Sequence, residues 1–402
     1  MVKAYLPAGP LREPMRSIDE FAWAKLTALE RAGLRRQPVV TAREGIWVER
    51  EGRRLLSFSC NDYLNLSRHP QVVTAAIEAI KRHGVGAGAS RLVTGNHPLY
   101  VELETRLARL KGTAAACVFG SGYLANSAII PALVGPADLV LVDELSHACI
   151  HAGAKLSGAL LCRYRHSDVT HVQTLLAQHR AAHPHALIAT DGVFSMDGDL
   201  APLAALAELG QRFDAWLLAD DAHGLGVVGG GRGSTFANGR ADVPLQMGTL
   251  SKAAGAYGGY LCASAAVVEL MHTRARPLIY STGLPPPAVA AAIAAIDLIE
   301  RQPDYVAEPL RKARMFTQAL NLPEAQSAIV PVILGEAETA LAASRQLEEE
   351  GFLVVAIRPP TVPPGTARLR FAFTAQHPEA EIERLAAVVR ARVLGSAGAA
   401  DL

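Results

Sequence analysis

The chain has 402 residues, of which 50% are apolar and 19% are charged, and its formal net charge is +1. This length predicts two or three domains with a large buried core. The near-zero charge, the few aromatic residues and the lack of a Lys/Arg block argue against a nucleic-acid partner.

Two further features of the sequence bear on where in the cell the protein is located. The five cysteines are odd in number and irregularly spaced, which is typical of buried thiols in a reducing compartment. The first residues carry no apolar segment of a signal peptide, and no apolar run approaches the roughly 20 residues that span a bilayer. We therefore expect a cytoplasmic protein with no membrane partner.

The chain begins with a helix and two strands. Residues 17–33 have the apolar period of an amphipathic helix, with Ser17 as N-cap and Gly33 at its end. Residues 45–60 predict two short strands around a Glu-Gly turn.

From about residue 70 to 270, apolar runs rich in β-branched residues alternate with stretches of helical period. The predicted strands lie at 114–120, 139–144, 159–166, 185–193, 215–223 and 258–264. The predicted helices between them lie at 100–112, 122–135, 168–183 and 200–213. This alternation predicts an α/β fold with a mostly parallel central sheet that is flanked by helices on both faces.

From about residue 286, a long helix leads into a smaller α+β unit. Its predicted strands lie at 328–336, 351–360 and 366–375, and the last one alternates like a half-buried antiparallel strand. The predicted domains are an N-terminal helix with small strands (1–60), a large α/β domain (61–290) and a C-terminal α+β domain (291–402).

Polar residues after the strands are candidate site residues, because ligands of open α/β sheets bind beyond the carboxyl ends of the strands. Gly120 to Tyr123 follow a strand and open a helix, whose free N–H groups suit a phosphate, although a plain tight turn also fits. His147, Cys149 and His151 follow the next strand. Their alternate spacing argues against a metal site, so His147 is either structural or stacked on a planar ligand.

Carboxylates follow two later strands. The segment 189–203 carries three aspartates and a serine, which fit either Mg²⁺ or a turn followed by an N-cap. Asp220 and His223 follow a strand that should be fully buried, where a carboxylate needs a positive partner such as a ligand cation. The glycine-rich run at 226–234 has no helix pattern after it, which argues against a dinucleotide site.

Lys252 stands in GTLSKAAGAYGG (248–259), among residues small enough for a flat ligand to come close. Burial in such surroundings lowers the pKa of a lysine and makes its amine nucleophilic. A buried amine, a carboxylate at Asp220, a ring at His147 and a Gly/Ser/Thr cup for phosphate form the set that pyridoxal phosphate needs. We expect Lys252 to form an imine with this cofactor and Asp220 to pair with its pyridinium nitrogen.

Nine stretches that run in order over almost the whole chain carry a resemblance to a known family. They are NDYLNLS (61–67), GVGAGASRLVTGNHPLYVELE (84–104), FGSGYLAN (119–126), LSHACIHAG (145–153), TDGVFSMDGDLAPL (190–203), DDAHGLGVVGGGRGS (220–234), GTLSKA (248–253), LIYSTGLPP (278–286) and IRPPTVPPGTARLRFAFTAQH (357–377). The sequence resembles the fold-type-I, pyridoxal-phosphate-dependent α-oxoamine synthases. The resemblance implies a mostly parallel sheet with flanking helices and a smaller α+β C-terminal domain.

Matched by position, the resemblance implies roles at the cofactor. Lys252 is similar to the lysine that forms the imine, Asp220 to the partner of the pyridinium nitrogen, and His223 to the donor to the ring hydroxyl. Ser195 resembles a residue near that hydroxyl, and His147 resembles the residue stacked on the ring. Of these, Lys252, His147, Asp220 and His223 are the implied catalytic residues.

The resemblance also implies cofactor contacts from backbone and hydroxyl groups. Gly122 and Tyr123 would offer backbone N–H groups, and Thr249 resembles a phosphate ligand. The implied substrate-binding residues are Arg35, Asn61, His147, Thr361 and Arg370, with Arg370 on the amino-acid carboxylate. We expect only one of Arg368 and Arg370 to face the site.

The implied reaction is a decarboxylative condensation of an amino acid with an acyl thioester. The 357–377 block is most similar to the members that use L-alanine and a pimeloyl thioester in biotin biosynthesis, with either coenzyme A or acyl carrier protein as carrier. The family also implies a homodimer with sites at the subunit interface. The alternatives are a sister synthase such as 2-amino-3-ketobutyrate CoA ligase, a nucleotide-binding oxidoreductase, and a non-catalytic protein of this fold.

Overall fold

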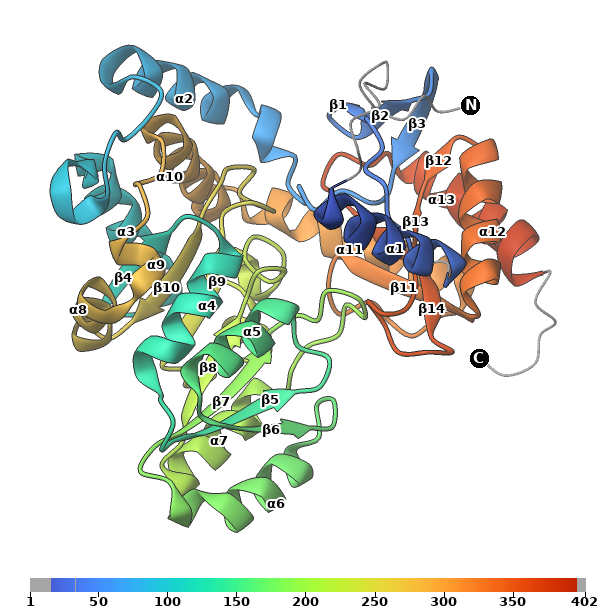
Figure 1. Ribbon diagram of the computed structural model, residues 1–402. Helices are drawn as coiled ribbons and strands as arrows, with labels where there is room; N and C mark the ends of the chain where they lie inside the picture. Colours follow the sequence, from blue (N-terminus) through green and yellow to red (C-terminus); the bar gives the residue numbers. More distant parts are fainter. Residues whose placement is uncertain (1–15, 33, 396–402) are drawn as a thin grey trace.

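The computed structural model describes residues 16–32 and 34–395, and its centre is a seven-stranded sheet of order β4-β10-β9-β8-β7-β5-β6 (Figure 1). The strands are β4 (Ala115–Phe119), β5 (Leu139–Asp143), β6 (Leu160–Tyr164), β7 (Ala186–Asp191), β8 (Trp216–Asp220), β9 (Leu245–Thr249) and β10 (Gly259–Ala263). Only β10 runs antiparallel to its neighbours. The predicted mostly parallel sheet is confirmed, and β9 is a strand that the sequence reading did not include.

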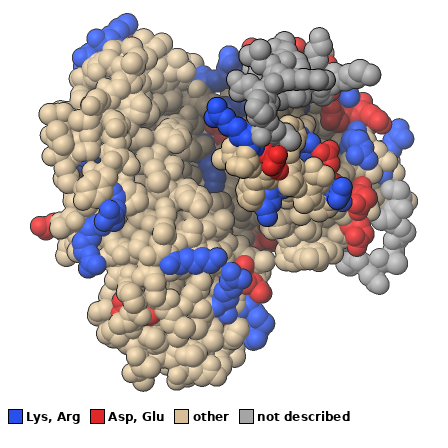
Figure 2. Space-filling view, in the orientation of Figure 1, with Lys and Arg blue, Asp and Glu red and all other residues tan. Residues whose placement is uncertain are grey.

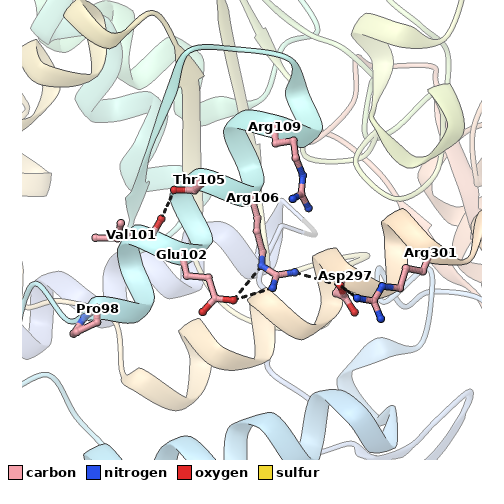
Figure 3. Close-up of a pocket in the computed structure, with 8 residues that line it drawn as sticks. All are labelled: Pro98, Val101, Glu102, Thr105, Arg106, Arg109, Asp297 and Arg301. Atoms are coloured by element: carbon pink, nitrogen blue, oxygen red, sulfur yellow. Dashed lines mark hydrogen bonds and ion pairs between the residues drawn. The ribbon is translucent and has the colours of Figure 1, made fainter.

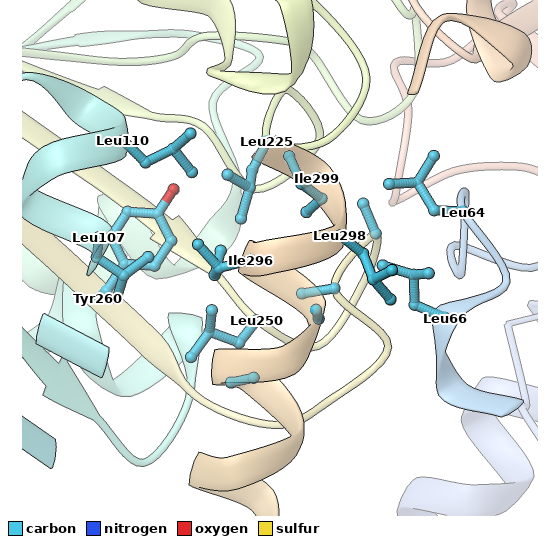
Figure 4. Close-up of a cluster of buried hydrophobic side chains, with 14 of the residues drawn as sticks. Leu64, Leu66, Leu107, Leu110, Leu225, Leu250, Tyr260, Ile296, Leu298 and Ile299 are labelled. Carbon is cyan, nitrogen blue, oxygen red and sulfur yellow. The ribbon is translucent and has the colours of Figure 1, made fainter. Parts of the chain in front are cut away.

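Helices cover both faces of this sheet. They are α2 (Pro70–His83), α3 (Pro98–Lys111), α4 (Gly122–Leu133), α5 (Ala148–Ser157), α6 (Val169–His179), α7 (Leu203–Phe213), α8 (Ala265–Arg274), α9 (Arg276–Ile279) and α10 (Pro286–Arg301). The Ala-rich helix α10 packs against α2 and α3, and its Ile296 and Ile299 join the same buried cluster as Leu107 and Tyr260 (Figure 4). This close packing fixes the large unit as a rigid support for the loops at the strand ends.

The C-terminal unit is built on two small sheets. Its helices and strands are α11 (Pro303–Leu320), β11 (Ile329–Gly335), α12 (Ala337–Glu349), β12 (Phe352–Leu353), β13 (Val355–Ile357), β14 (Ala367–Ala372) and α13 (Glu379–Val388). One sheet has the order β11-β14-β13, with β14 antiparallel to both neighbours as predicted. Every residue of β14 is buried, so the half-buried expectation is wrong: its second face lies against the large unit.

The expectation of a single strand at 351–360 is also wrong, because this segment forms two short strands, β12 and β13. These two short strands join different sheets: β13 pairs with β14, whereas β12 pairs in parallel with β3 (Arg53–Ser57). The second sheet therefore has the order β1-β2-β3-β12, with β1 (Ala42–Glu44) and β2 (Trp47–Arg50). It joins the N-terminal strands to the C-terminal unit, as Figure 1 shows.

The first helix, α1 (Ser17–Arg31), is shorter than expected and begins one residue earlier, since Arg16 rather than Ser17 is the N-cap. Gly33, the expected end of the helix, lies outside the described residues. The two strands around the Glu51-Gly52 turn are confirmed as β2 and β3. Within the described ranges, no helix combines the length and apolar character that crossing a bilayer requires.

Candidate active site

A cavity of about 250 Å³ lies where the carboxyl ends of the parallel strands meet. Eight residues singled out in the sequence line it together: Gly122, Tyr123, His147, Ser195, Asp220, His223, Thr249 and Lys252. They lie at the carboxyl ends of β8 and β9, at the start of α4, and in the segments that follow β5, β7, β8 and β9. The sheet therefore brings to one place residues that lie 130 positions apart, from Gly122 to Lys252.

Lys252 follows β9 in a tight turn and points its amine at His223. Its Nζ lies 2.8 Å from Nε2 of His223, and Nδ1 of the same ring lies 2.6 Å from the hydroxyl of Tyr63. Burial lowers the pKa of Lys252 to about 8, against the opposing pull of the nearby carboxylates. Burial and the Lys252 charge hold the pKa of His223 well below its usual range. A neutral, nucleophilic amine is therefore accessible near pH 8.

The carboxylate of Asp220 stands at the floor of the cavity. It accepts hydrogen bonds from Nδ2 of Asn126 at 2.6 Å and from the backbone N–H of Ala222 at 3.0 Å. Burial, and then the charge of Asp220, raise the pKa of the neighbouring Asp191 carboxyl well above its usual range. The Asp220 carboxylate lines the cavity, where it can face a cationic group.

The adjacent Asp221 points away from the cavity into the protein. Its Oδ2 lies 2.6 Å from Nζ of Lys111, and both side chains are fully buried. Its Oδ1 accepts the backbone N–H of Ser234 at 2.9 Å, which ties down the glycine-rich loop after β8. The two consecutive aspartates therefore point in different directions: Asp220 lines the cavity and Asp221 binds the loop.

His147 forms one wall of the cavity. It is the N-cap of α5, since its Nδ1 accepts the backbone N–H of Cys149 at 3.3 Å. The ring is open to the cavity, yet partial burial lowers its pKa, so it is neutral near pH 7. A neutral ring with an open face suits stacking on a planar ligand. Among the described residues, no group of three or more His, Cys, Asp or Glu side chains could hold a metal ion.

Another part of the cavity lining comes from Ser121, Gly122 and Tyr123 at the start of α4. Ser121 caps this helix by accepting the backbone N–H of Leu124 at 3.2 Å. A Cβ on Gly122 would lie 3.3 Å from Met247 Cε and 3.4 Å from Cβ of Thr249, so glycine keeps this wall thin. The start of this helix and Thr249 both line the cavity, and the first N–H groups of a helix suit a phosphate; the Thr249 hydroxyl itself donates to the carbonyl of Gly258 at 2.8 Å.

Arg370 reaches the edge of the site from β14. Its Nε donates to the carbonyl of Ser195 at 2.5 Å and its Nη2 donates to Oδ1 of Asn61 at 3.2 Å. Arg368 lies on the same side and binds Asp197. The two arginines share a face of the strand, because residues two apart on a strand point to the same side, but only Arg370 contacts a residue that lines the cavity. Arg370 meets the turn that lines the cavity, and Arg368 holds the next part of that turn.

The structure does not bring Arg35 or Thr361 to the cavity. The guanidinium of Arg35 pairs with Glu30 at 2.5 Å, and the neighbouring Arg36 donates to Oγ1 of Thr361 at 2.9 Å. Sequence reasoning also missed Tyr63, Asn126 and Lys111. Tyr63 and Asn126 lie in quoted motifs but carry no signal of their contacts, and Lys111 is a lysine at a helix end whose burial only packing reveals.

A larger groove of about 710 Å³ lies between α3 and α10 (Figure 3). Its charged groups pair with one another: Arg106 with Glu102 and Asp297, and Arg301 with Asp297. None of the candidate site residues lines this groove, so the smaller cavity is the candidate active site.

Comparisons with known proteins agree with this site. The family model for aminotransferases of class I and II matches residues 53–389. The 8-amino-7-oxononanoate synthase of Methylocella silvestris is 67% identical over 85% of this chain and 97% of its own length. The 8-amino-7-oxononanoate synthase of Beijerinckia indica is 62% identical over 93% of this chain and 98% of its own length.

Solved structures are similar over nearly the whole chain. A serine palmitoyltransferase from S. paucimobilis superposes with a TM-score of 0.87 at 29% identity, covering 96% of this chain and all of the other. An 8-amino-7-oxononanoate synthase from Francisella tularensis superposes with a TM-score of 0.73 at 27% identity, covering 85% of this chain and 99% of the other.

The fold and these comparisons together define an enzyme that uses pyridoxal phosphate, the cofactor of this class. The chain belongs to the aminotransferase class I and II family and, within it, to the 8-amino-7-oxononanoate synthases, which are acyltransferases of biotin biosynthesis.

Proposed function

We propose that this protein condenses L-alanine with a pimeloyl thioester, giving 8-amino-7-oxononanoate, carbon dioxide and the free carrier. The observation that carries the proposal is the arrangement of Lys252, Asp220 and His223 in one cavity, in a chain 67% identical to a synthase of this name. The 357–377 block, which the sequence reading linked to pimeloyl-using members, supports the same substrate.

The residues of the cavity fit pyridoxal phosphate. The close approach at Gly122 and the N-terminus of α4 suit its phosphate, and Asp220 suits its ring nitrogen; we propose that Thr249 also contacts the phosphate, by turning its hydroxyl away from the Gly258 carbonyl. We propose that His147 stacks on the ring, that His223 and Ser195 serve its hydroxyl, and that Tyr123 adds a backbone N–H. When bound, the cofactor supplies an electron sink for the α-carbon of the amino acid.

The protein's own residues orient the substrate and move its proton. Arg370 lies at the cavity edge beside Asn61 and is the cation for the carboxylate of L-alanine. Holding that carboxylate aims the Cα–H bond at Nζ of Lys252, which takes the proton as a neutral amine. His223 accepts a hydrogen bond at Nε2 and keeps this amine in place. We propose that Thr361 and Arg35, together with Arg36, contact the acyl substrate.

We also propose a cytoplasmic homodimer with active sites at the subunit interface. α1 buries no residue in the single chain, and its Phe21 and Trp23 are at least half exposed. Val85 and Val93, before α3, are each 74% exposed. On the face shown in Figure 2, the large unit carries few charged side chains. Such apolar surface favours a second copy of the chain, and Tyr280 in the LIYSTG segment is also exposed.

The test is product formation by the purified, cofactor-loaded protein. We expect L-alanine with pimeloyl-CoA or pimeloyl-acyl carrier protein to release thiol and yield 8-amino-7-oxononanoate by mass spectrometry. Glycine or serine as the preferred amino acid would overturn the substrate assignment in favour of a sister synthase. Lys252→Ala should abolish turnover and borohydride labelling, whereas Lys155→Ala, at an exposed lysine, should change neither.

A further inference from the structure

A histidine outside the cavity joins three loops at the carboxyl edge of the sheet. His166 follows β6, and its Nδ1 lies 3.1 Å from Oδ1 of Asp143 at the end of β5. Its Nε2 lies 2.9 Å from Oδ2 of Asp199, in the segment after β7. One imidazole thus bridges two carboxylates from different strands, which requires both ring nitrogens to donate when both carboxylates are ionised.

Each carboxylate is anchored to a loop that serves the active site. Asp143 accepts the backbone N–H of Leu145 at 2.9 Å, two residues before His147. The backbone carbonyl of Asp199 accepts the N–H of Phe194 at 3.0 Å and closes the 194–199 turn, which carries Ser195. The ring of His166 also packs edge-on against Phe194, with the ring centroids 4.4 Å apart.

The 194–199 turn is held from the opposite side by the C-terminal unit. Arg370 donates to the carbonyl of Ser195, and Arg368 binds Asp197. The turn therefore lies between the guanidinium of Arg370 and the imidazole of His166. His166 itself does not line the cavity, so it acts on the site only through these loops.

We propose that His166 is a positioning residue. Shared by Asp143 and Asp199, it sets the spacing between His147 and the 194–199 turn, whose Ser195 carbonyl binds Arg370. This inference rests on the proposed function for the identity of the substrate whose carboxylate Arg370 holds. A shift of the 194–199 turn would move Ser195 and Arg370 together, so it would weaken amino-acid binding before it changed later steps.

The charge state of His166 supports this arrangement. Burial alone would lower its pKa, but the hydrogen bonds that the ring donates to Asp143 and Asp199 outweigh burial and raise the pKa to about 10. The charged or titratable groups around the ring and its loop are Asp143, Asp199, Glu144, Arg165, Asp168 and His171. The carboxylates hold the imidazolium through the physiological pH range.

The test uses three variants of the holoenzyme: His166→Gln, Asp199→Asn, and His179→Gln as a control at a half-buried histidine on α6. We expect His166→Gln to raise the KM for L-alanine about tenfold with a smaller change in kcat, and His179→Gln to leave both near wild type. An unchanged KM in His166→Gln, even with a lower unfolding temperature, would overturn the proposal by making the residue a structural brace only.

Asp199→Asn gives an independent readout through pH. Removing one carboxylate lowers the pKa of His166, so the KM of this variant relative to wild type should rise with pH between 6 and 9 as the ring loses its proton. NMR of ¹³C-labelled histidine, with the His166 signal assigned by its absence in His166→Gln, should show no titration below about pH 9 in wild type. A wild-type titration near pH 6.5, or a KM ratio that is flat with pH, would overturn the proposal. The NMR result is independent of the substrate, so failure of the proposed function leaves it intact.

Discussion

Lys252 and His223 lie 2.8 Å apart through Nζ and Nε2, and this pair is one end of a hydrogen-bond chain across the site. With Lys252 donating to Nε2, the Nδ1–H of His223 donates to the hydroxyl of Tyr63, and Tyr63 donates to Oδ1 of Asn61 at 3.2 Å. Asn61 also accepts a hydrogen bond from Arg370. The proposed base is therefore linked to the proposed carboxylate-binding residue through side chains alone.

The first prediction concerns the pH at which the cofactor-free protein captures pyridoxal phosphate. Because the pKa of Lys252 is about 8, the neutral amine is the minor form below pH 8 and the major form above it. The capture rate should therefore rise with pH and level off above about 8, as followed by stopped-flow absorbance. A rate that still rises tenfold per pH unit between 9 and 10 would indicate an ordinary, solvated lysine.

The second prediction concerns Tyr63. Tyr63→Phe leaves Nδ1–H of His223 without its buried acceptor, which we expect to lower kcat about tenfold. Tyr305→Phe is the matched control, because the Tyr305 hydroxyl donates to the carbonyl of Leu64 and is outside this chain of hydrogen bonds. Equal effects of the two variants on kcat would contradict a catalytic role for the Tyr63 hydroxyl.

The third prediction compares the consecutive aspartates. Asp220→Asn removes the charge that faces the cavity, so it should cost about a hundredfold or more in kcat while the protein stays folded. Asp221→Asn leaves the fully buried ammonium of Lys111 unpaired, so it should lower the free energy of unfolding by about 3–5 kcal/mol. Urea denaturation and steady-state kinetics measure the two effects. The reverse pattern would show that the roles of the two residues are exchanged.

The fourth prediction concerns acid stability. His377 accepts the N–H of Thr374 and lies 3.0 Å from the carbonyl of Ser57, and burial lowers its pKa to about 3. The unfolded chain takes up a proton near pH 6.5, so this stability is present above pH 6.5 and is lost as pH falls, by about 1.4 kcal/mol per unit.

His377→Gln should therefore lose less stability than wild type between pH 6.5 and 4.5. Both proteins share the contribution of the carboxylates, so it cancels when the two are compared. Calorimetry at each pH measures the difference in their free energies of unfolding. Parallel stability curves for the two proteins would show that His377 is protonated in the folded state.

The sequence predicted the parts of the fold that depend on local pattern. The alternation of β-branched runs with helical stretches predicted the parallel sheet, because buried parallel strands are continuous apolar runs. It did not predict the split into β12 and β13, because pairing with different sheets depends on distant strands. The division of the chain at residues 60 and 290 stays a prediction, as do the roles of the individual site residues.

By itself, the sequence indicated the chemical groups of the site: the amine of Lys252 among small residues, and the carboxylate of Asp220 and the ring of His147 after predicted strands. The tertiary structure decided which of two neighbours reaches the site, as with Asp220 over Asp221, and it supplied partners such as Lys111 and Tyr63. The physical reason is that burial and hydrogen bonding depend on contacts between segments far apart in the chain. A motif fixes the residue types, whereas packing fixes their direction, their partners and the resulting pKa values.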